Sequence, residues 1–158
     1  MMYSKIMVPY DGSEHAKHAI EYAKGLTAGT DIPIVIVHVV PSGVMGTDQI
    51  GDAGSLDGVP FGMLDYAQYE GVVKAALDQA KAKVVENLGD TISDAVDRIS
   101  VEAIAGTAPA EALARYAEKV GCDLIVMGRR GLGAIRGMLG SVSFGVLRST
   151  EIPVLTVK

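Results

Sequence analysis

Residues 124–143 read Leu-Ile-Val-Met-Gly-Arg-Arg-Gly-Leu-Gly-Ala-Ile-Arg-Gly-Met-Leu-Gly-Ser-Val-Ser. The first four residues are apolar without interruption, which predicts a strand that is buried on both faces. The glycines that follow let backbone N–H groups approach an anion closely, and a helix beginning at about Ser141 would add its N-terminal dipole. This stretch indicates a site for a phosphate-bearing ligand, although glycines after a strand also serve plain turns.

Short apolar runs alternate with helical stripes along the rest of the chain. The runs predict strands at residues 6–8, 32–40, 99–103, 124–127 and 154–157. Apolar residues at helical spacing predict helices over residues 16–26, 73–88 and 107–117, and a short one from about 141. Strands that alternate with helices favour parallel pairing and right-handed crossovers. We therefore expect an α/β fold, a three-layer, Rossmann-like open sheet of five parallel strands.

Length and composition are typical of a globular protein. The chain has 158 residues, of which 49% are hydrophobic and 21% charged, so we expect one domain with one core. The longest apolar run, Ile32 to Val40, has nine residues and is far too short for a membrane span. No signal peptide is visible, and the single cysteine suits a reducing compartment. These features predict a cytoplasmic protein.

Acidic residues concentrate in one segment. Residues 41–70 hold five acidic residues and no Lys or Arg, whereas the rest of the chain balances 14 basic against 14 acidic residues. The part from about 41 to 66 contains six glycines and is too long for an ordinary connection. We interpret it as an insert, either a solvated loop or a cover over the ligand. Because no basic stripe is present, we expect neither a nucleic-acid nor a membrane partner.

Two common phosphate-binding motifs are missing from the glycine-rich stretch. Gly131, Gly133 and Gly137 miss the G-x-G-x-x-G spacing by one residue, and no G-x-x-x-x-G-K-[ST] occurs. These differences disfavour a dinucleotide-dependent dehydrogenase and a P-loop enzyme.

The motifs resemble those of the universal stress protein family over nearly the whole chain. The resemblance rests on the opening Ile6-Met7-Val8-Pro9-Tyr10-Asp11-Gly12-Ser13, on Gly128-x-x-Gly131, on Gly140-Ser141-Val142-Ser143 and on the ending Ile152-Pro153-Val154-Leu155-Thr156-Val157. It implies a sheet of strand order 3-2-1-4-5, of the adenine nucleotide alpha hydrolase-like type. One departure concerns residues 132–139, because these eight residues are one fewer than ATP-binding members usually place before the Gly-Ser pair.

The resemblance further implies a site for ATP or another adenine nucleotide, with Mg²⁺ or Mn²⁺ bridging the phosphates. By that match the adenine and ribose would be held by Pro9, Tyr10, Asp11 and Val39. The ribose and phosphates would be lined by Met127, Gly128, Gly131, Gly140, Ser141, Val142 and Ser143. Arg129 and Arg130 lie between the motif glycines, and their contact with phosphate is our inference from their charge. We assign no protein ligand to the metal.

The last strand predicts a protein partner. Residues 154–157 read Val-Leu-Thr-Val and would form an edge of the sheet. An exposed apolar edge invites pairing with another chain. Because members of the family form homodimers through this strand, the resemblance implies a symmetric homodimer through Val154–Val157.

These observations lead to one hypothesis and two alternatives. We expect an ATP-binding, nucleotide-responsive dimeric module of the stress response, and we assign no catalytic residue because no base is placed for hydrolysis. A weak ATPase of the same fold is one alternative. A dimeric interaction protein that binds no nucleotide is the other.

Five further side chains carry competing interpretations. Asp11 at a strand end could be a phospho-acceptor, but neither an acidic neighbour nor a lysine on a late strand loop accompanies it. We interpret Cys122 as a buried, inert thiol rather than a redox site. His15 and His18 are interpreted as surface residues rather than a metal pair. His38 is interpreted as the end of a buried strand, with a satisfied imidazole, rather than as a base.

Overall fold

The computed structural model describes residues 2–42, 55–56, 59–60, 65–132 and 138–158. Five strands form one parallel sheet in the order β5-β2-β1-β6-β7. They are β1 (Ile6–Pro9), β2 (Ile34–Pro41), β5 (Ile99–Gly106), β6 (Leu124–Gly128) and β7 (Val154–Val157). Counted among the five predicted strands, this is the order 3-2-1-4-5, so the predicted fold class is confirmed.

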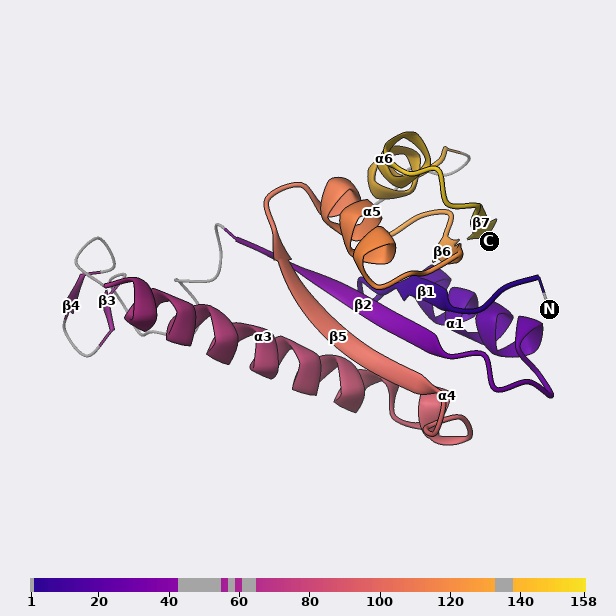
Figure 1. Ribbon diagram of the computed structural model, residues 1–158, viewed down its shortest axis with the longest axis horizontal. Helices are drawn as coiled ribbons and strands as arrows, with labels where there is room; N and C mark the ends of the chain where they lie inside the picture. The colour runs from indigo at the N-terminus through magenta and orange to yellow at the C-terminus, as the bar shows by residue number, and fades with distance from the viewer. Residues whose placement is uncertain (1, 43–54, 57–58, 61–64, 133–137) are drawn as a thin grey trace.

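Helices cover both faces of the sheet (Figure 1). One face carries α1 (Glu14–Leu26), α3 (Tyr66–Leu88) and the short α4 (Asp90–Ser93), and the other carries α5 (Pro109–Lys119) and α6 (Ser141–Ser149). A separate antiparallel pair is formed by β3 (Ser55–Leu56) and β4 (Val59–Pro60). None of the helices in the described ranges combines the length and the apolar character needed to cross a bilayer.

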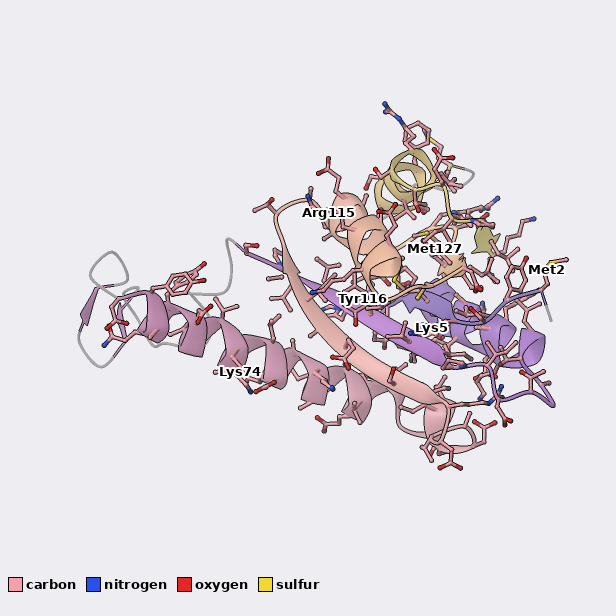
Figure 2. All side chains as sticks on the ribbon, in the orientation of Figure 1. Met2, Lys5, Lys74, Arg115, Tyr116 and Met127 are labelled. Atoms are coloured by element: carbon pink, nitrogen blue, oxygen red, sulfur yellow. The ribbon has the colours of Figure 1, made fainter. Side chains whose placement is uncertain are left out.

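Alternation along the strands divides the core into two clusters. Ile6 and Val8 of β1 pack toward α1 and α3, whereas Met7 between them packs toward α5 and α6. All three side chains are fully buried, which explains why this strand is continuously apolar rather than alternating. Helix α5 is amphipathic: Tyr116 lies toward the sheet and Arg115 points away from it (Figure 2).

Four residues separate β1 from the first helix, and a local cap explains where the helix begins. The Ser13 hydroxyl accepts a hydrogen bond from the Ala16 N–H at 3.1 Å, which satisfies one of the free amides of the first turn. The buried face of α1 contains three alanines and one isoleucine, so the helix can lie close to the sheet. The carboxyl end of β1 is thereby held close to the first turn of α1.

Helix α3 is longer than predicted. The pattern predicts a helix over residues 73–88, but α3 begins at Tyr66 because Asp65 and Gln68 form a capping box. The Asp65 Oδ1 accepts from the Gln68 N–H at 2.8 Å, and the Gln68 Oε1 accepts from the Asp65 N–H at 3.0 Å. The amino-terminal half of α3 projects past the sheet (Figure 1).

Two predicted features fall in whole or in part on residues that the structure does not describe. Residues 43–54, 57–58 and 61–64 of the acidic insert are among them, so both interpretations of the insert lie outside the described residues. Residues 133–137 of the glycine-rich loop also lie outside them.

Candidate functional site

A cavity of about 660 Å³ lies at the carboxyl ends of β1, β2 and β6. Strand β1 is the centre of the sheet, with β2 on one side and β6 on the other. After β1 the chain adds β2 and β5 on one side of it, and it later adds β6 and β7 on the other side. The strand order therefore reverses at β1. Open parallel sheets bind their ligands at such a switch point, beyond the carboxyl ends of the strands.

The cavity brings together twelve of the thirteen predicted site residues. They are Pro9, Tyr10, Asp11, Val39, Met127, Gly128, Arg130, Gly131, Gly140, Ser141, Val142 and Ser143. Arg129 is the exception, since it does not line the cavity. The two arginines lie next to each other in the sequence, yet only one of them faces this space.

Seven lining residues were not predicted, namely Ala16, Val37, His38, Pro41, Pro109, Leu113 and Leu132. Val37 and Pro41 lie two residues on either side of Val39 on the same strand, so the period of two along β2 could have identified them. Pro109 and Leu113 lie on α5, more than sixty residues from β2 in the sequence. No local pattern connects them to the site.

At one end of the cavity, the Val39 N–H and C=O have no hydrogen-bond partner on the β1 side among the described residues. Along β2, residues bond alternately to β5 and to β1: the Ser42 N–H donates to the Gly106 carbonyl at 3.2 Å, and the Val37 carbonyl accepts from the Tyr10 N–H at 2.9 Å. Val39 follows Val37 by two residues, so its N–H and C=O turn to the same side. There β1 has already ended and the cavity begins.

The turn after β1 is held by His38. Its Nδ1 lies 2.9 Å from the Tyr10 carbonyl oxygen. Because a carbonyl only accepts, Nδ1 carries the hydrogen and donates it. The Tyr10 side chain is buried, and this burial raises the pKa of its phenol, with the positive charge of Lys17 opposing the rise. The imidazole of His38 is thus hydrogen-bonded, but the residue lies inside β2 and not at the strand end as predicted. The bond fixes the direction of the chain at Asp11.

The opposite end of the cavity is closed by hydrogen bonds to one carbonyl. The Arg129 carbonyl accepts from the Gly140 N–H and from the Ser143 hydroxyl, both at 2.9 Å. The Arg129 N–H donates to the Val157 carbonyl at 2.6 Å. These contacts join the two ends of the glycine-rich loop and tie both to β7, so that the loop begins and ends at fixed points.

Helix α6 begins where the loop closes. Its N-cap is Gly140, and no side chain caps its first turn. The first amides of a helix have no acceptor within the helix and carry a partial positive charge. Ser141, Val142 and Ser143 all line the cavity. This end of the cavity can therefore bind an anion through backbone N–H groups and the helix dipole.

Arg129 and Arg130 each have a buried Nε with no hydrogen-bond partner among the described residues. Neither guanidinium takes part in an ion pair within the described part of the chain. An unpaired guanidinium beside a cavity favours an anionic ligand. Only Arg130 meets that condition, because it lines the cavity.

The remaining reactive side chains lie outside this site. Cys122 is buried, and burial raises the pKa of its thiol to about 11, which keeps it in the unreactive protonated form. The His18 Nδ1 lies 3.2 Å from the Lys158 carbonyl oxygen. The His15 Nδ1 has no partner among the described residues. Those residues contain no cluster of three or more His, Cys, Asp or Glu side chains arranged to hold a metal ion.

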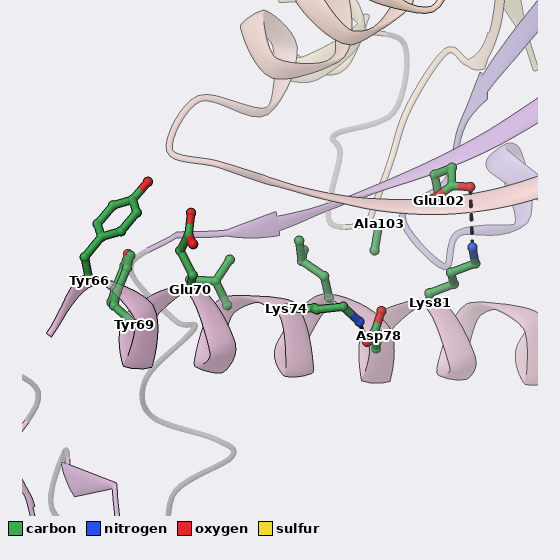
Figure 3. A pocket seen from close by; sticks show the side chains of 10 residues that line it. Tyr66, Tyr69, Glu70, Lys74, Asp78, Lys81, Glu102 and Ala103 are labelled. Carbon is green, nitrogen blue, oxygen red and sulfur yellow. Dashed lines mark hydrogen bonds and ion pairs between the residues drawn. The ribbon is translucent and has the colours of Figure 1, made fainter. Parts of the chain in front are cut away.

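A second cavity of about 590 Å³ lies between α3 and β5 (Figure 3). Four of its five charged side chains already pair with one another: Lys81 Nζ lies 3.4 Å from Glu102 Oε1, and Lys74 Nζ lies 2.6 Å from Asp78 Oδ2. It contains none of the predicted site residues. The cavity at the strand ends is the better candidate, because it combines an apolar wall with unpaired donors.

The chain is similar in sequence to known proteins over its whole length. The sequence model of the universal stress protein family matches residues 2–158. A universal stress protein of Thermus aquaticus is 32% identical over 161 residues, an alignment that spans 99% of this chain and 100% of the relative.

Solved structures show the same fold. Universal stress protein UspA from Lactobacillus plantarum superposes with a TM-score of 0.69 at 20% identity, covering 100% of this chain and 99% of that one. A universal stress protein in complex with cAMP gives 0.57 at 25% identity, covering 100% and 98%. One from Archaeoglobus fulgidus in complex with dAMP gives 0.55 at 20% identity, covering 100% of both chains. The family motifs, the sheet order and the full-length match agree, and the chain belongs to the universal stress protein family.

Proposed function

We propose that this chain binds ATP or another adenine nucleotide in the cavity at the strand ends, and acts as a nucleotide-responsive dimeric module of the stress response in the cytoplasm. The observation that carries the proposal is the division of the cavity into two unlike ends. One end has apolar walls and the Val39 backbone groups, which lack a partner on the β1 side within the described ranges, and the other has the uncapped start of α6 and Arg130.

Each end suits one part of a nucleotide. A backbone N–H and C=O on one strand edge match the N1 acceptor and N6 donor of adenine, while Pro9 and Met127 offer apolar surface to the ring. The amides at residues 141–143 suit phosphate oxygens. A volume of about 660 Å³ lies within the range usual for sites of cofactor size. Related proteins crystallised with cAMP and dAMP support an adenine ligand.

Isothermal titration calorimetry on the full chain tests this proposal. We expect ATP, ADP and AMP to bind, and GTP and UTP to bind roughly 10- to 100-fold more weakly. Guanine and uracil present an oxygen acceptor and a ring N–H donor where adenine presents the N6 donor and the N1 acceptor, so the Val39 carbonyl would face an acceptor and the Val39 N–H a donor. Equal affinity for all three bases would contradict adenine recognition. A titration without heat for every adenine nucleotide, repeated by equilibrium dialysis, would contradict nucleotide binding altogether.

We further propose the homodimer through β7. Strand β7 pairs only with β6 among the described strands, and Leu155 on this edge is 37% exposed. Replacing Leu155 with lysine should prevent edge-to-edge pairing, because two copies would bring like charges together at a two-fold axis. Light scattering should then give one chain of 16.5 kDa instead of two.

The control for that prediction is Val96→Lys, which places the same charge at another exposed apolar residue. Val96 is 61% accessible and lies in the turn before β5, the edge strand opposite β7. This variant should leave the dimer intact. Dimers in both variants, or monomers in the unmodified protein, would rule out this interface.

A Mg²⁺ or Mn²⁺ ion is proposed to accompany the phosphates. Mg²⁺ and Mn²⁺ prefer oxygen ligands, and Asp11 supplies the one carboxylate among the described residues that line the cavity. In that position the ion would neutralise phosphate charge, with most of its remaining ligands coming from the nucleotide and water.

A further inference from the structure

The cavity between α3 and β5, which we call the α3–β5 groove, follows one face of the helix. Its lining residues on α3 recur at helical spacing along about four turns and are Tyr66, Tyr69, Glu70, Val73, Lys74, Leu77, Asp78 and Lys81. From the first to the last of them the helix rises about 22 Å. Among the described residues of the sheet, only Glu102 and Ala103 line the groove, and the amino-terminal half of α3 continues past the sheet (Figure 1). The groove is therefore long and open, with the edge of a strand near one end.

The outer edge of β5 offers backbone groups to this groove. The Arg98 carbonyl accepts from the Ile34 N–H of β2 at 2.8 Å. At the other end of β5, the Gly106 carbonyl accepts from the Ser42 N–H at 3.2 Å. The even-numbered residues of β5 thus bond to β2, and the odd-numbered ones turn their N–H and C=O away from it. Ala103 is odd-numbered and lines the groove, and its N–H and C=O have no hydrogen-bond partner among the described residues.

Glu70 is the one charged side chain of the groove that forms no ion pair within the described part of the chain. Tyr66 is 77% exposed and Tyr69 is 49% exposed, one turn or less from Glu70 on α3. Figure 3 shows the three side chains on the side of the helix that faces the groove. A lysine or arginine side chain can pair with such a carboxylate and lie over an aromatic ring. The groove therefore favours a ligand with a basic side chain.

We propose that the α3–β5 groove binds an extended, basic peptide segment of a partner protein. The segment adds a strand to β5 at Ala103 and continues along α3, where its lysine or arginine meets Glu70 and the two tyrosines. About seven extended residues span the 22 Å of the groove, at roughly 3.3 Å each. In this mode of recognition, backbone hydrogen bonds supply affinity and the side chains supply specificity.

The surroundings of β5 are compatible with such a segment. The Lys81–Glu102 ion pair beside Ala103 is 44% and 40% exposed, so a bound segment displaces it at little cost. Strand β5 forms the edge of the sheet opposite β7, and the proposed homodimer leaves it open. Because strand-edge groups pair with an extended backbone, whereas a helix satisfies its own, an extended segment suits this edge better than a helical one.

A displayed library of random heptapeptides, selected on the immobilised full chain, supplies the probe. We expect enrichment of peptides that combine lysine or arginine with β-branched residues, which favour the extended conformation. One enriched peptide, labelled with fluorescein, is then titrated with the protein and followed by fluorescence anisotropy. The proposal is wrong if no peptide is enriched over a bare surface, or if the enriched peptides lack a basic residue.

A charge reversal tests the basic side chain. Glu70→Arg should weaken binding of the peptide at least about tenfold, because it replaces attraction with repulsion. A peptide whose basic residue is changed to glutamate should bind Glu70→Arg within about threefold of the original pair. The matched control is Glu86→Arg, on an exposed part of the same helix outside the groove, which should change the affinity less than about threefold. Equal losses in the two variants would mean that the peptide binds by general charge, and would overturn the proposal.

A second pair of measurements tests the added strand. Ala103→Pro removes the outward N–H and leaves the bonds to β2 in place, and it should weaken binding about tenfold. If this variant does not fold, N-methylated peptides test the same bonds on the unmodified protein. Only alternate N–H groups of a strand face its neighbour, so methylation of one alternate set should weaken binding at least about tenfold, and of the other set less than about threefold. Equal effects of both sets would show that the peptide does not bind as a strand.

Light scattering distinguishes a partner protein from a second copy of this chain. If the chain forms oligomers that Ala103→Pro disrupts and the peptide displaces, a second copy occupies the groove and the proposal of a partner protein is wrong. If the oligomeric state is the same for the unmodified chain and for Ala103→Pro, while the peptide binds only the former tightly, the proposal is supported.

Discussion

Replacing Gly128 with alanine is expected to lower the free energy of unfolding by about 2 kcal/mol, the usual cost of forcing extra atoms into a packed interior. A Cβ at this position would lie 2.8 Å from the His15 Cβ and 2.9 Å from the His15 backbone carbonyl carbon. Because a backbone atom cannot rotate away, β6 and α1 must separate. Both elements are fully packed here, and the strain should be only partly relieved.

The same change should also weaken nucleotide binding, since Gly128 and Ala16 of α1 both line the cavity. Urea denaturation monitored by circular dichroism gives the change in the unfolding free energy. The matched control is Gly71→Ala on α3, where a Cβ meets no atom within 4 Å. It should stabilise the protein by roughly 0.5–1 kcal/mol because alanine favours the helix. A neutral Gly128→Ala would show that the close approach of β6 to α1 carries no cost.

Replacing Arg130 with alanine is expected to weaken ATP binding by roughly 10- to 100-fold, the range for losing a charged hydrogen bond to phosphate. The guanidinium lines the cavity, and its Nε has no partner among the described residues, so the ligand is expected to supply one. The loss should be smaller for AMP, which presents fewer phosphate oxygens to the loop. Calorimetry with both nucleotides measures the difference.

Arg129→Ala provides the control for Arg130. The two residues are adjacent, carry the same charge and share a buried Nε without a described partner, but Arg129 does not line the cavity. Its removal should change ATP affinity by less than about threefold, because only the long-range attraction between its positive charge and the phosphates is lost. Equal losses for the two variants would mean that the loop attracts phosphate by its overall charge, and that contact with Arg130 is not involved.

The glycine-rich loop and the strands could be predicted because their signals are local. Leu124 to Met127 is buried on both faces, and such strands have continuous apolar sequences. The Gly-Ser pair at residues 140–141 follows the loop, and the helix indeed begins at Ser141. The start of α3 was equally local: Asp65 and Gln68 have the spacing of a capping box, and that signal extends the helix to Tyr66.

The sequence by itself thus predicted the five strands of the sheet, the start of α6 and the position of the glycine-rich loop, because periodicity and helix starts depend on residues a few positions apart. Only the tertiary structure decided three features of the site. It brought Leu113 of α5 into the cavity, separated Arg130 from Arg129, and placed the Asp11 carboxylate against Gly131. These features depend on how crossovers pack segments that lie far apart in the chain. A short sequence pattern does not encode that packing.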